Sequence, residues 1–580
     1  MPPTTEATEP RARSEVADAL QRLVAVSDSP PGFAGRSRVP VRSGNNNEYD
    51  TVEDRWRLGF PTWDRYDQGH PRVFDYPYTI GALFDPFRQN VLKGDYPIYG
   101  QHTFLNVSGS ATYLFEGRSV PTAVSPPLAG SPRPLVRNFF SRDGQFAHSE
   151  LYLLSFDLFH GDTAFKPADW RVRLTPAFGL NSVSAQTLRV VSPDPGAGNV
   201  LVLGRPTLQE WFAEYKIAET SSAYDFVSVR AGAQPFTSDF RGFVYSDVNR
   251  GVRLFGNADA NRTQYNLAYF RQLDKDSATQ LNTFRDRDQN IVIANLYRQD
   301  FVFPGYNVEG SFHYNNDGPD IQFARNGSLV RPDPVGARQP HRVEAYYLGL
   351  AGDGHIGRLS LSHAAYWVLG RDGMNPIAGR PQSISAGMAA LELSYTADWI
   401  RFRTSGFWAS GDGNARDGRA HGFDSILDNT NFAGAFSYFR RQRVALFGVG
   451  LPNDQSLYPD MRASRVQGQS NFVNPGLWLV NAGVDFEVTP AFRLVNNANF
   501  LWFDRTNAIE TFTQLGHINR QIGLDLSSGW EYRPRLNNNC IITSGLATLI
   551  PGAGYRRIYN PTGSGSNLLL AGFVEMSFAF

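Results

Sequence analysis

Apolar and polar residues alternate along the chain from about residue 100 to its end. In the first such segment the odd-numbered positions are apolar, namely Leu105, Val107, Ala111, Tyr113 and Phe115. The even-numbered positions between them are polar, namely Asn106, Ser108, Ser110 and Thr112. The alternation recurs in 170–181, 306–315, 478–488 and 522–532. Because successive side chains of a β-strand point to opposite faces, it predicts strands with one apolar face and an all-β fold class.

Eighteen segments carry the alternation, and the two weakest, 206–219 and 250–257, leave 16 strands as the alternative. The expected strands are 101–117, 146–160, 168–183, 206–219, 223–234, 250–257, 261–273, 289–302, 305–315, 340–351, 355–370, 384–397, 399–411, 475–488, 491–505, 516–532, 536–549 and 567–580.

The connections between these segments alternate in length. The short ones are Ser221-Ser222, Asn257 to Ala260, Pro304-Gly305, Gly352 to Gly354, Ala397-Asp398, Thr489-Pro490 and Pro534-Arg535. The long ones are 118–145, 184–205, 235–249, 274–288, 316–339, 371–383, 412–474, 506–515 and 550–566. Transmembrane barrels have short periplasmic turns and long extracellular loops. A soluble sandwich gives no reason for such sorting, so the pattern predicts a closed antiparallel transmembrane β-barrel.

The last strand alternates most clearly. Leu568, Leu570, Val574, Met576, Phe578 and Phe580 share one face, and the sequence stops at Phe580. An apolar C-terminal strand ending in phenylalanine resembles the assembly signal of bacterial outer-membrane barrels. That resemblance assigns Phe578 and Phe580 to recognition by the barrel-assembly machinery, and the bacterial outer membrane to the location of the chain.

Closure of the sheet follows from the solvent. Inside hydrocarbon every backbone polar group needs a partner within the protein, so 101–117 should pair with 567–580. The apolar faces then contact outer-membrane lipid and the polar faces line the lumen. This arrangement reconciles a mean hydropathy of −0.34 with a membrane location.

Composition removes several other classes. The chain carries 55 basic and 55 acidic side chains, which leaves no electrostatic footprint for nucleic acid. One cysteine, Cys540, excludes a disulfide scaffold, and no apolar run reaches 18 residues. The start, MPPTTEATEPRARSE, shows no secretory signal. We therefore expect that the signal has been removed or that the start site is mis-set.

Residues 1–100 are interpreted as an N-terminal extension and 101–580 as the barrel. An amphipathic helix is expected at 14–26. The irregular segment 36–100 is rich in aromatic residues and lies either in the lumen as a small plug or in the periplasm. Its aromatic side chains need burial, which favours the lumen.

The polar parity predicts which charged side chains line the pore. The basic candidates are Arg171, Arg173, Lys216, Arg230, Arg342, Arg401, Arg403 and Arg533. The acidic candidates are Glu210, Glu214, Glu309, Glu344, Glu392, Asp485, Glu487, Asp525, Glu531 and Glu575. Eight against ten is close to balance, whereas an ion-selective pore would carry a lopsided ring. The lining favours neutral or zwitterionic cargo, or internal ion pairs around a plug.

Two arginine pairs, Arg171 with Arg173 and Arg401 with Arg403, each place two guanidinium groups on one face. They would either form a ladder for carboxylate-bearing solutes or pair with neighbouring acidic residues, and we favour pairing.

The long connection 412–474 carries Phe, Tyr and Arg and is expected to fold into the mouth as a constriction. Its start holds a weak calcium candidate, Asp412, Asn414 and Asp417, which lacks the full spacing of a calcium loop. Surface turns use the same residues for backbone reasons, and this explanation is preferred.

The sequence contains no P-loop, HExxH or GxSxG motif, so we expect no enzymatic activity and no cofactor. From residue 100 onward the pattern resembles bacterial porin-like outer-membrane proteins. The stretch RAGAQPFTSDFRGFVYSD with GVRLFG, in 230–256, is similar to phosphate-selective and alginate-export-type porins. That resemblance lies in architecture only, and it implies about 18 strands.

The first hypothesis for function is a porin-like channel for the passage of small solutes or oligomeric polar cargo across the outer membrane. The alternatives are a sheath around a periplasmic partner, such as an electron-transfer cytochrome, and a gated uptake receptor. The sequence leaves the cargo and the oligomeric state open.

Overall fold

The fold was obtained as a computed structural model. It describes residues 90–100, 102–121, 144–161, 166–333, 336–430, 432–437, 461–462, 464, 466–534, 538–559 and 568–580. The expected helix at 14–26 and most of the segment 36–100 lie outside these residues. Within them, no helix is long and apolar enough to cross a membrane.

Eighteen antiparallel strands form one closed barrel, so the larger of the two expected numbers is confirmed. The strands are β2 (Thr103–Ser119), β3 (Gly144–His160), β4 (Trp170–Ala185), β5 (Val200–Glu219), β6 (Phe226–Thr237), β7 (Ser246–Ala258), β8 (Thr263–Lys275), β9 (Asn282–Arg298), β10 (Tyr306–Asp317), β13 (Val343–Ile356), β14 (Leu359–Asn375), β15 (Arg380–Ala397), β16 (Ile400–Ala409), β18 (Leu477–Thr489), β19 (Phe492–Trp502), β20 (Gln521–Tyr532), β21 (Cys540–Pro551) and β22 (Leu569–Ala579). Each pairs with its neighbour in chain order.

The first and last barrel strands close the sheet. β2 pairs antiparallel with β22 from Ser110 opposite Ala579 to Arg118 opposite Ala571. The predicted pairing of 101–117 with 567–580 is therefore confirmed. Closure gives the two strands the backbone partners that a hydrocarbon environment demands.

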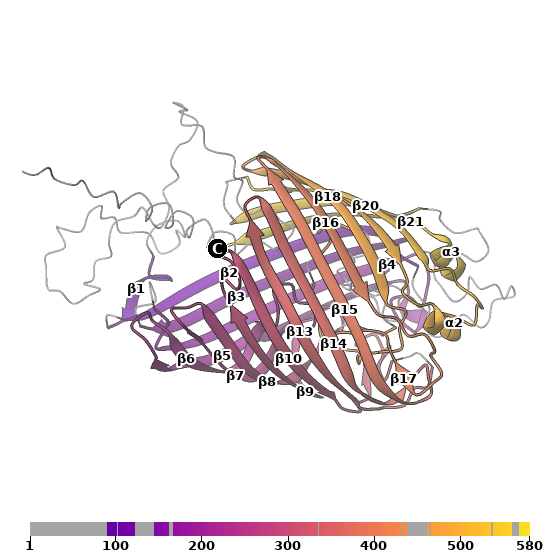
Figure 1. Ribbon diagram of the computed structural model, residues 1–580, viewed down its shortest axis with the longest axis horizontal. Helices are drawn as coiled ribbons and strands as arrows, with labels where there is room; N and C mark the ends of the chain where they lie inside the picture. Colours follow the sequence, from indigo (N-terminus) through magenta and orange to yellow (C-terminus); the bar gives the residue numbers. More distant parts are fainter. Residues whose placement is uncertain are drawn as a thin grey trace, which may run out of the picture.

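The connections sort by end of the barrel, as the alternation predicts. Figure 1 shows the two ends: β1 (Lys93–Tyr99) and the C-terminus lie toward one end, here called the short-turn end. The short helices α2 (Asn507–Thr513) and α3 (Ala553–Tyr559) lie at the other, the long-loop end. The two-residue strand β17 (Arg419–Ala420) also lies there, paired in parallel with the start of β15.

Several predicted connections are wrong in their bounds; the expected 184–205 and 235–249, for example, are 186–199 and 238–245. The expected loops 274–288 and 371–383 shrink to 276–281 and 376–379, because β8, β9, β14 and β15 continue beyond the expected ends. The expected turn at Gly352 to Gly354 is part of β13, which runs to Ile356. Glycine there reads as a turn signal, but each of these glycines pairs across the sheet with β10 and β14.

The outer face of the barrel is apolar over most strands. Leu348 and Leu350 on β13, Trp367 on β14 and Leu391 on β15 are exposed, and each alternates with a buried neighbour. On β22 the exposed residues are Leu570, Val574 and Phe578, which is the face that the C-terminal alternation predicts. An exposed apolar band of this extent on a closed barrel fits a lipid environment.

The inner face is less polar than the sequence suggests. Toward the long-loop end, inward side chains of β8–β16 are apolar and buried, among them Phe270, Ile291, Tyr347, Val368 and Phe407. They pack against loops that enter the barrel and form a hydrophobic core inside it. Strands apolar on both faces are typical of sheets covered on both sides, so AYYLGLA in 345–351 carried this signal in the sequence.

An arginine on the lipid face should destabilise the barrel according to its depth. Leu391 is 45% exposed between Ala389 and Leu393 on the outer face of β15. Leu391→Arg should lower the free energy of unfolding in lipid vesicles by about 2–4 kcal/mol. The matched control is Ala397→Arg, on the same face beside the turn, where the cost should be about 0–1 kcal/mol. Equal costs at both positions would contradict a lipid boundary between them.

Candidate functional site

The candidate site is the interior of the barrel, which several connections from the long-loop end enter. Segment 238–245, between β6 and β7, and the described parts of 410–476, between β16 and β18, contact inward-facing side chains of the wall. The sequence predicts that 412–474 folds into the mouth, and described residues of this connection, among them Phe423, Phe432 and Phe472, do pack against the inner wall. Residues 438–460 lie outside the described part of the chain.

The turn that begins segment 238–245 is organised by one carboxylate. Asp239 accepts hydrogen bonds from the backbone N–H groups of Arg241, Gly242 and Phe243. Such a turn is typical of aspartate, whose short side chain reaches the amides that follow it. The Tyr366 hydroxyl, on the inner face of β14, donates to Asp239 Oδ2 at 2.7 Å and fixes the turn to the wall.

Arg241 attaches the same segment to two further positions on the barrel wall. Its guanidinium lies 3.1 Å from Glu392 on β15 and donates to the Ser362 hydroxyl on β14 at 3.2 Å. Both partners of the ion pair are about 3% exposed. A buried pair of this kind is specific in geometry, because neither charge can move away without losing its partner.

The two inserted segments also bind each other. Ile426 N–H donates to Val244 O at 3.1 Å, and Ser246 N–H donates to Leu427 O at 2.8 Å. The Phe432 ring meets Phe243 edge to face and packs against Phe407 of β16. The segments therefore form one body that covers the inner wall of β13–β18.

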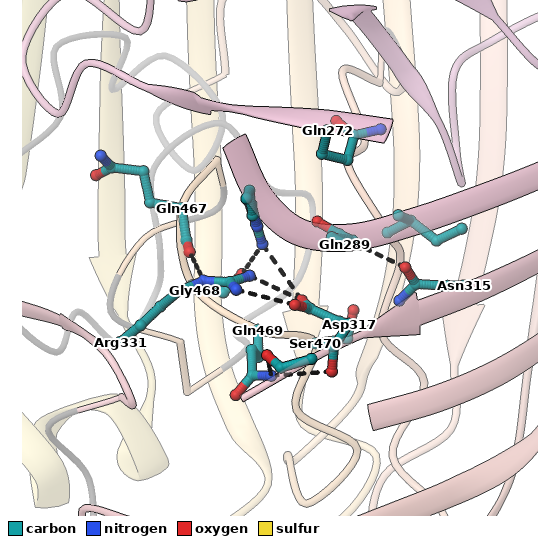
Figure 2. A network of polar contacts seen from close by, with 12 residues as sticks. Gln272, Gln289, Asn315, Asp317, Arg331, Gln467, Gly468, Gln469 and Ser470 are labelled. Atoms are coloured by element: carbon teal, nitrogen blue, oxygen red, sulfur yellow. Dashed lines mark hydrogen bonds and ion pairs between the residues drawn. The ribbon is translucent and has the colours of Figure 1, made fainter. Parts of the chain in front are cut away.

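A second polar network holds residues 466–470 against the opposite edge of this wall (Figure 2). Asp317, at the end of β10, accepts two hydrogen bonds from Arg331, at 2.9 and 2.7 Å, and one from Arg287 of β9 at 3.3 Å. Arg331 ends β12 (Leu329–Arg331), which pairs with β11 (Gln322–Phe323). All three side chains are at most 2% exposed.

Arg287 and Arg331 also donate hydrogen bonds to backbone carbonyl groups of the inserted segment. Arg287 donates to Val466 O at 2.8 Å and to Gly468 O at 3.0 Å, and Arg331 donates to Gln467 O. Figure 2 shows Arg331 and Asp317 beside the strip of chain that carries Gln467, Gly468 and Gln469. We call Asp317, Arg287 and Arg331 the latch.

Arg462 forms a comparable contact inside the loop. Its Nε lies 2.6 Å from Asp424 Oδ2, and Nη2 donates to the Ser470 hydroxyl at 3.0 Å. Asp424 O in turn accepts from the Tyr347 hydroxyl of β13 at 3.0 Å. This pair ties the beginning of the long connection to its end.

Most of the predicted pore-lining residues face the interior, on the parity opposite the exposed apolar side chains. Those are Arg171, Arg173, Glu210, Glu214, Lys216, Arg230, Glu309, Glu392, Arg401, Arg403, Asp485, Glu487, Asp525, Glu531 and Arg533. Whether they line a path for solutes stays a prediction. Arg342 and Glu344 lie elsewhere: they share the outer face of β13 with Tyr346 and Leu348, because the buried parity there is Val343, Ala345 and Tyr347. Glu575 of β22 has the parity of the inner face but is half-buried.

The inner wall of β3–β6 keeps charges partly open to solvent. Arg171 pairs with Asp157 at 3.1 Å, and Arg173 pairs with Glu210 at 2.9 Å. Both arginine side chains are 32% exposed. Nearby, Arg230 lies 2.5 Å from Glu214 and over the Phe212 ring. The covered wall on the other side carries pairs that are almost completely buried, such as Arg403 with Asp485 at 2.9 Å.

These contacts decide between the two interpretations of the arginine pairs. Arg171, Arg173 and Arg403 each face a carboxylate, as pairing with neighbouring acidic residues predicts. Arg401 instead donates to the Ser394 hydroxyl at 2.9 Å. Remaining charges at the short-turn end are also paired: Lys216 with Asp169 at 2.8 Å, and Arg533 with Glu531 at 2.7 Å.

The calcium candidates act as turn residues. Asp412 accepts from His421 N–H at 3.2 Å, Asn414 from Arg416 N–H at 3.3 Å and Asp417 from Arg419 N–H at 2.8 Å. Among the described residues no three His, Cys, Asp or Glu side chains are grouped to hold a metal ion. The backbone explanation of this motif is therefore sufficient.

The sequence did not indicate the residues that hold the inserted loops. Asp239, Arg241, Asp317, Arg331 and Arg462 lie in or beside connections, where no alternation shows which way a side chain points. One signal was available in the segments SDFRGF and LVRPD, where an arginine lies beside turn residues. If such a loop enters the barrel, burying the guanidinium without a partner is unfavourable, so the arginine must find one.

No family model matches the chain, and no curated protein matches its sequence. Solved structures resemble the chain at low sequence identity, and three from Pseudomonas aeruginosa serve as examples. OccK9 (OpdG) has 10% identity and a TM-score of 0.44, over 82% of this chain and 98% of that one. OccK11 (OpdR) has 14% sequence identity and a TM-score of 0.42, over 82% of this chain and 96% of that one. The outer membrane protein OpdK has 9% identity and a TM-score of 0.41, over 82% of this chain and 98% of that one. These values carry no inference to this chain.

Removing the latch carboxylate should release the inserted segment. Asp317→Ala leaves Arg287 and Arg331 buried without their carboxylate, which typically costs about 3–5 kcal/mol. We expect amide hydrogen exchange of residues 466–470 to accelerate strongly while that of β18 and β19 is unchanged. Asp320→Ala is the control, because Asp320 pairs with the half-exposed Arg285 and such pairs contribute about 0–1 kcal/mol. Unchanged exchange in Asp317→Ala would show that the latch does not hold the segment.

Stability should also depend on the ionisation of Asp412. Burial raises the pKa of this carboxyl from its ordinary 3.8 to about 6, against the opposing hydrogen bond from His421 N–H. The folded protein therefore binds a proton that the unfolded chain releases between these values, so this stabilisation is present below pH 4 and is lost as the pH rises through 6. Asp412→Asn should be more stable than the wild type at pH 7.5 and equal to it near pH 4, measured by thermal unfolding. A constant difference across this range would contradict the raised pKa.

Proposed function

We propose that the chain is a porin-like channel of the bacterial outer membrane through which small polar solutes pass, with neutral or zwitterionic solutes preferred. The observation that carries this proposal is a closed barrel, apolar outside, whose inner wall on β3–β6 holds balanced and partly exposed ion pairs. A pore requires an outer face that contacts lipid and an inner face that contacts water.

The inserted segments support an asymmetric path. They cover the inner wall of β13–β18 and bury its charges, whereas Arg171, Arg173 and Arg230 on the facing wall keep contact with solvent. A solute moving along that wall meets each guanidinium beside a carboxylate. Such a track offers donors and acceptors to a polar solute without a strong net field, so ions of either sign should be weakly selected.

The alternative of a sheath around a periplasmic partner receives no support. A protein partner such as a cytochrome would need the lumen for itself. Segments 238–245, 410–437 and 466–476 already pack against the inner wall there.

Planar-bilayer recordings of the purified chain test the proposal. We expect discrete conductance steps with a cation-to-anion permeability ratio near one, because the accessible inner charges are paired. Glu210→Gln should shift the ratio toward anions by about twofold or more, since it frees Arg173, and Arg173→Gln should shift it by a similar factor toward cations.

Arg342→Gln is the matched control. Arg342 directly precedes β13 and has the parity of its outer face, so its loss should leave the permeability ratio at the wild-type value. Absence of conductance in the wild type and also in Asp317→Ala would contradict the channel. A conductance indifferent to Glu210 and Arg173 would contradict the path along β3–β6.

A further inference from the structure

The closing seam of the barrel leaves part of one strand without its neighbour. On one edge β2 pairs with β3 along its whole length, from Thr103 opposite His160 to Ser119 opposite Gly144. On the other edge β22 covers β2 only from Ser110 to Arg118. Strand stagger is a necessary consequence of closing a sheet into a tilted barrel, and here it exposes the edge of 103–108.

β1 continues the sheet where β22 stops. Phe580 and Gly109 exchange two backbone hydrogen bonds, at 3.1 and 2.8 Å, which are the last contacts of the C-terminal strand. Val107 N–H, the next donor on this edge, is bound by Leu92 O at 2.6 Å. The pairing then runs from Lys93 opposite Asn106 to Tyr99 opposite Thr103. Two segments more than 450 residues apart in sequence thus follow one another along one edge.

Lys93 lies at the junction between them. Its ammonium donates to Val107 O at 2.7 Å and lies 3.8 Å from the centroid of the Phe580 ring. The side chain thereby joins β1, β2 and the C-terminal residue in one contact. A cation at this distance from an aromatic face contributes about 0.5–1 kcal/mol at an exposed site, in addition to the hydrogen bond.

Pro97 gives β1 the character of a last strand. Proline has no backbone N–H to donate, so within sheets it is found on edge strands, at the first residue of a strand or at bulges. Here it pairs with Phe104 at an irregular register. A proline-bearing edge discourages the addition of a further chain, so β1 both occupies the open edge of β2 and ends the growth of the sheet.

We propose that residues 90–99 are a sealing strand: β1 occupies the edge of β2 that the C-terminal strand leaves open, and Lys93 locks it to Phe580. The N-terminal segment then completes the barrel wall at the short-turn end. Without it, the donors of 103–107 on that edge would be a ready site for another chain. This role goes beyond solute passage and is independent of it.

Hydrogen exchange of the full-length protein tests the lock. Lys93→Ala should accelerate exchange in the peptide 103–108 by about tenfold and leave 110–118 unchanged. Lys93→Arg, which keeps the cation and a donor, should stay near the wild type. Lys166→Ala is the control, because this lysine also lies at the short-turn end but contacts Glu219. Conductance should be the same in all four proteins.

A cross-link tests the position of β1 even if Lys93→Ala fails to assemble. In a Cys540→Ser background, Tyr99→Cys with Thr103→Cys places two thiols at an opposed pair of β1 and β2 and keeps Lys93. Oxidation should form a disulfide in the folded barrel and raise the temperature at which it unfolds in detergent. A barrel that folds but does not cross-link, or wild-type exchange of 103–108 as fast as that of an unstructured peptide, would overturn the proposal.

Discussion

The structure depends on one constraint: in hydrocarbon, each backbone N–H and C=O must find its partner within the sheet. Eighteen strands satisfy it only by closing on themselves, and β2 with β22 supplies the closure. Closure then fixes what each face can be. One parity of every strand contacts lipid and must be apolar, and the other is enclosed and can be polar, charged or packed against inserted chain.

The enclosed face uses that freedom differently on its two sides. Along β13–β18 it buries apolar and ion-paired residues under the inserted segments, with Asp239, the latch and Arg462 as points of attachment. Along β3–β6 it keeps Arg171 and Arg173 in partial contact with water beside their carboxylates. The division matters for function, because a wall filled by its own loops can hold a constriction while the other wall faces solute.

Burial also explains why the ion pairs inside the barrel differ in their contribution to stability. Charges in the latch are withdrawn from water, and they are tolerable because each guanidinium meets a carboxylate and backbone carbonyls together. The ion pairs of β3–β6 are less withdrawn and correspondingly weaker. Arginine and carboxylate side chains therefore hold the inserted segments on one wall and line the lumen on the other. Their degree of burial distinguishes the two roles.

The sequence by itself determined the barrel, the alternation of most strands and the seam, since a period of two, the sorted connections and the C-terminal strand are local patterns; the choice of 18 strands over 16 needed the structure. It also indicated most inward charges, but it misplaced Arg342 and Glu344, because the interior beside the start of β13 is apolar and buries Val343 and Ala345 instead. Only the tertiary structure decided which connections enter the barrel and what holds them. Asp317 meets Arg287 and Arg331 through contacts between separate elements, and no spacing along the chain records a partner brought close by the closure of the sheet.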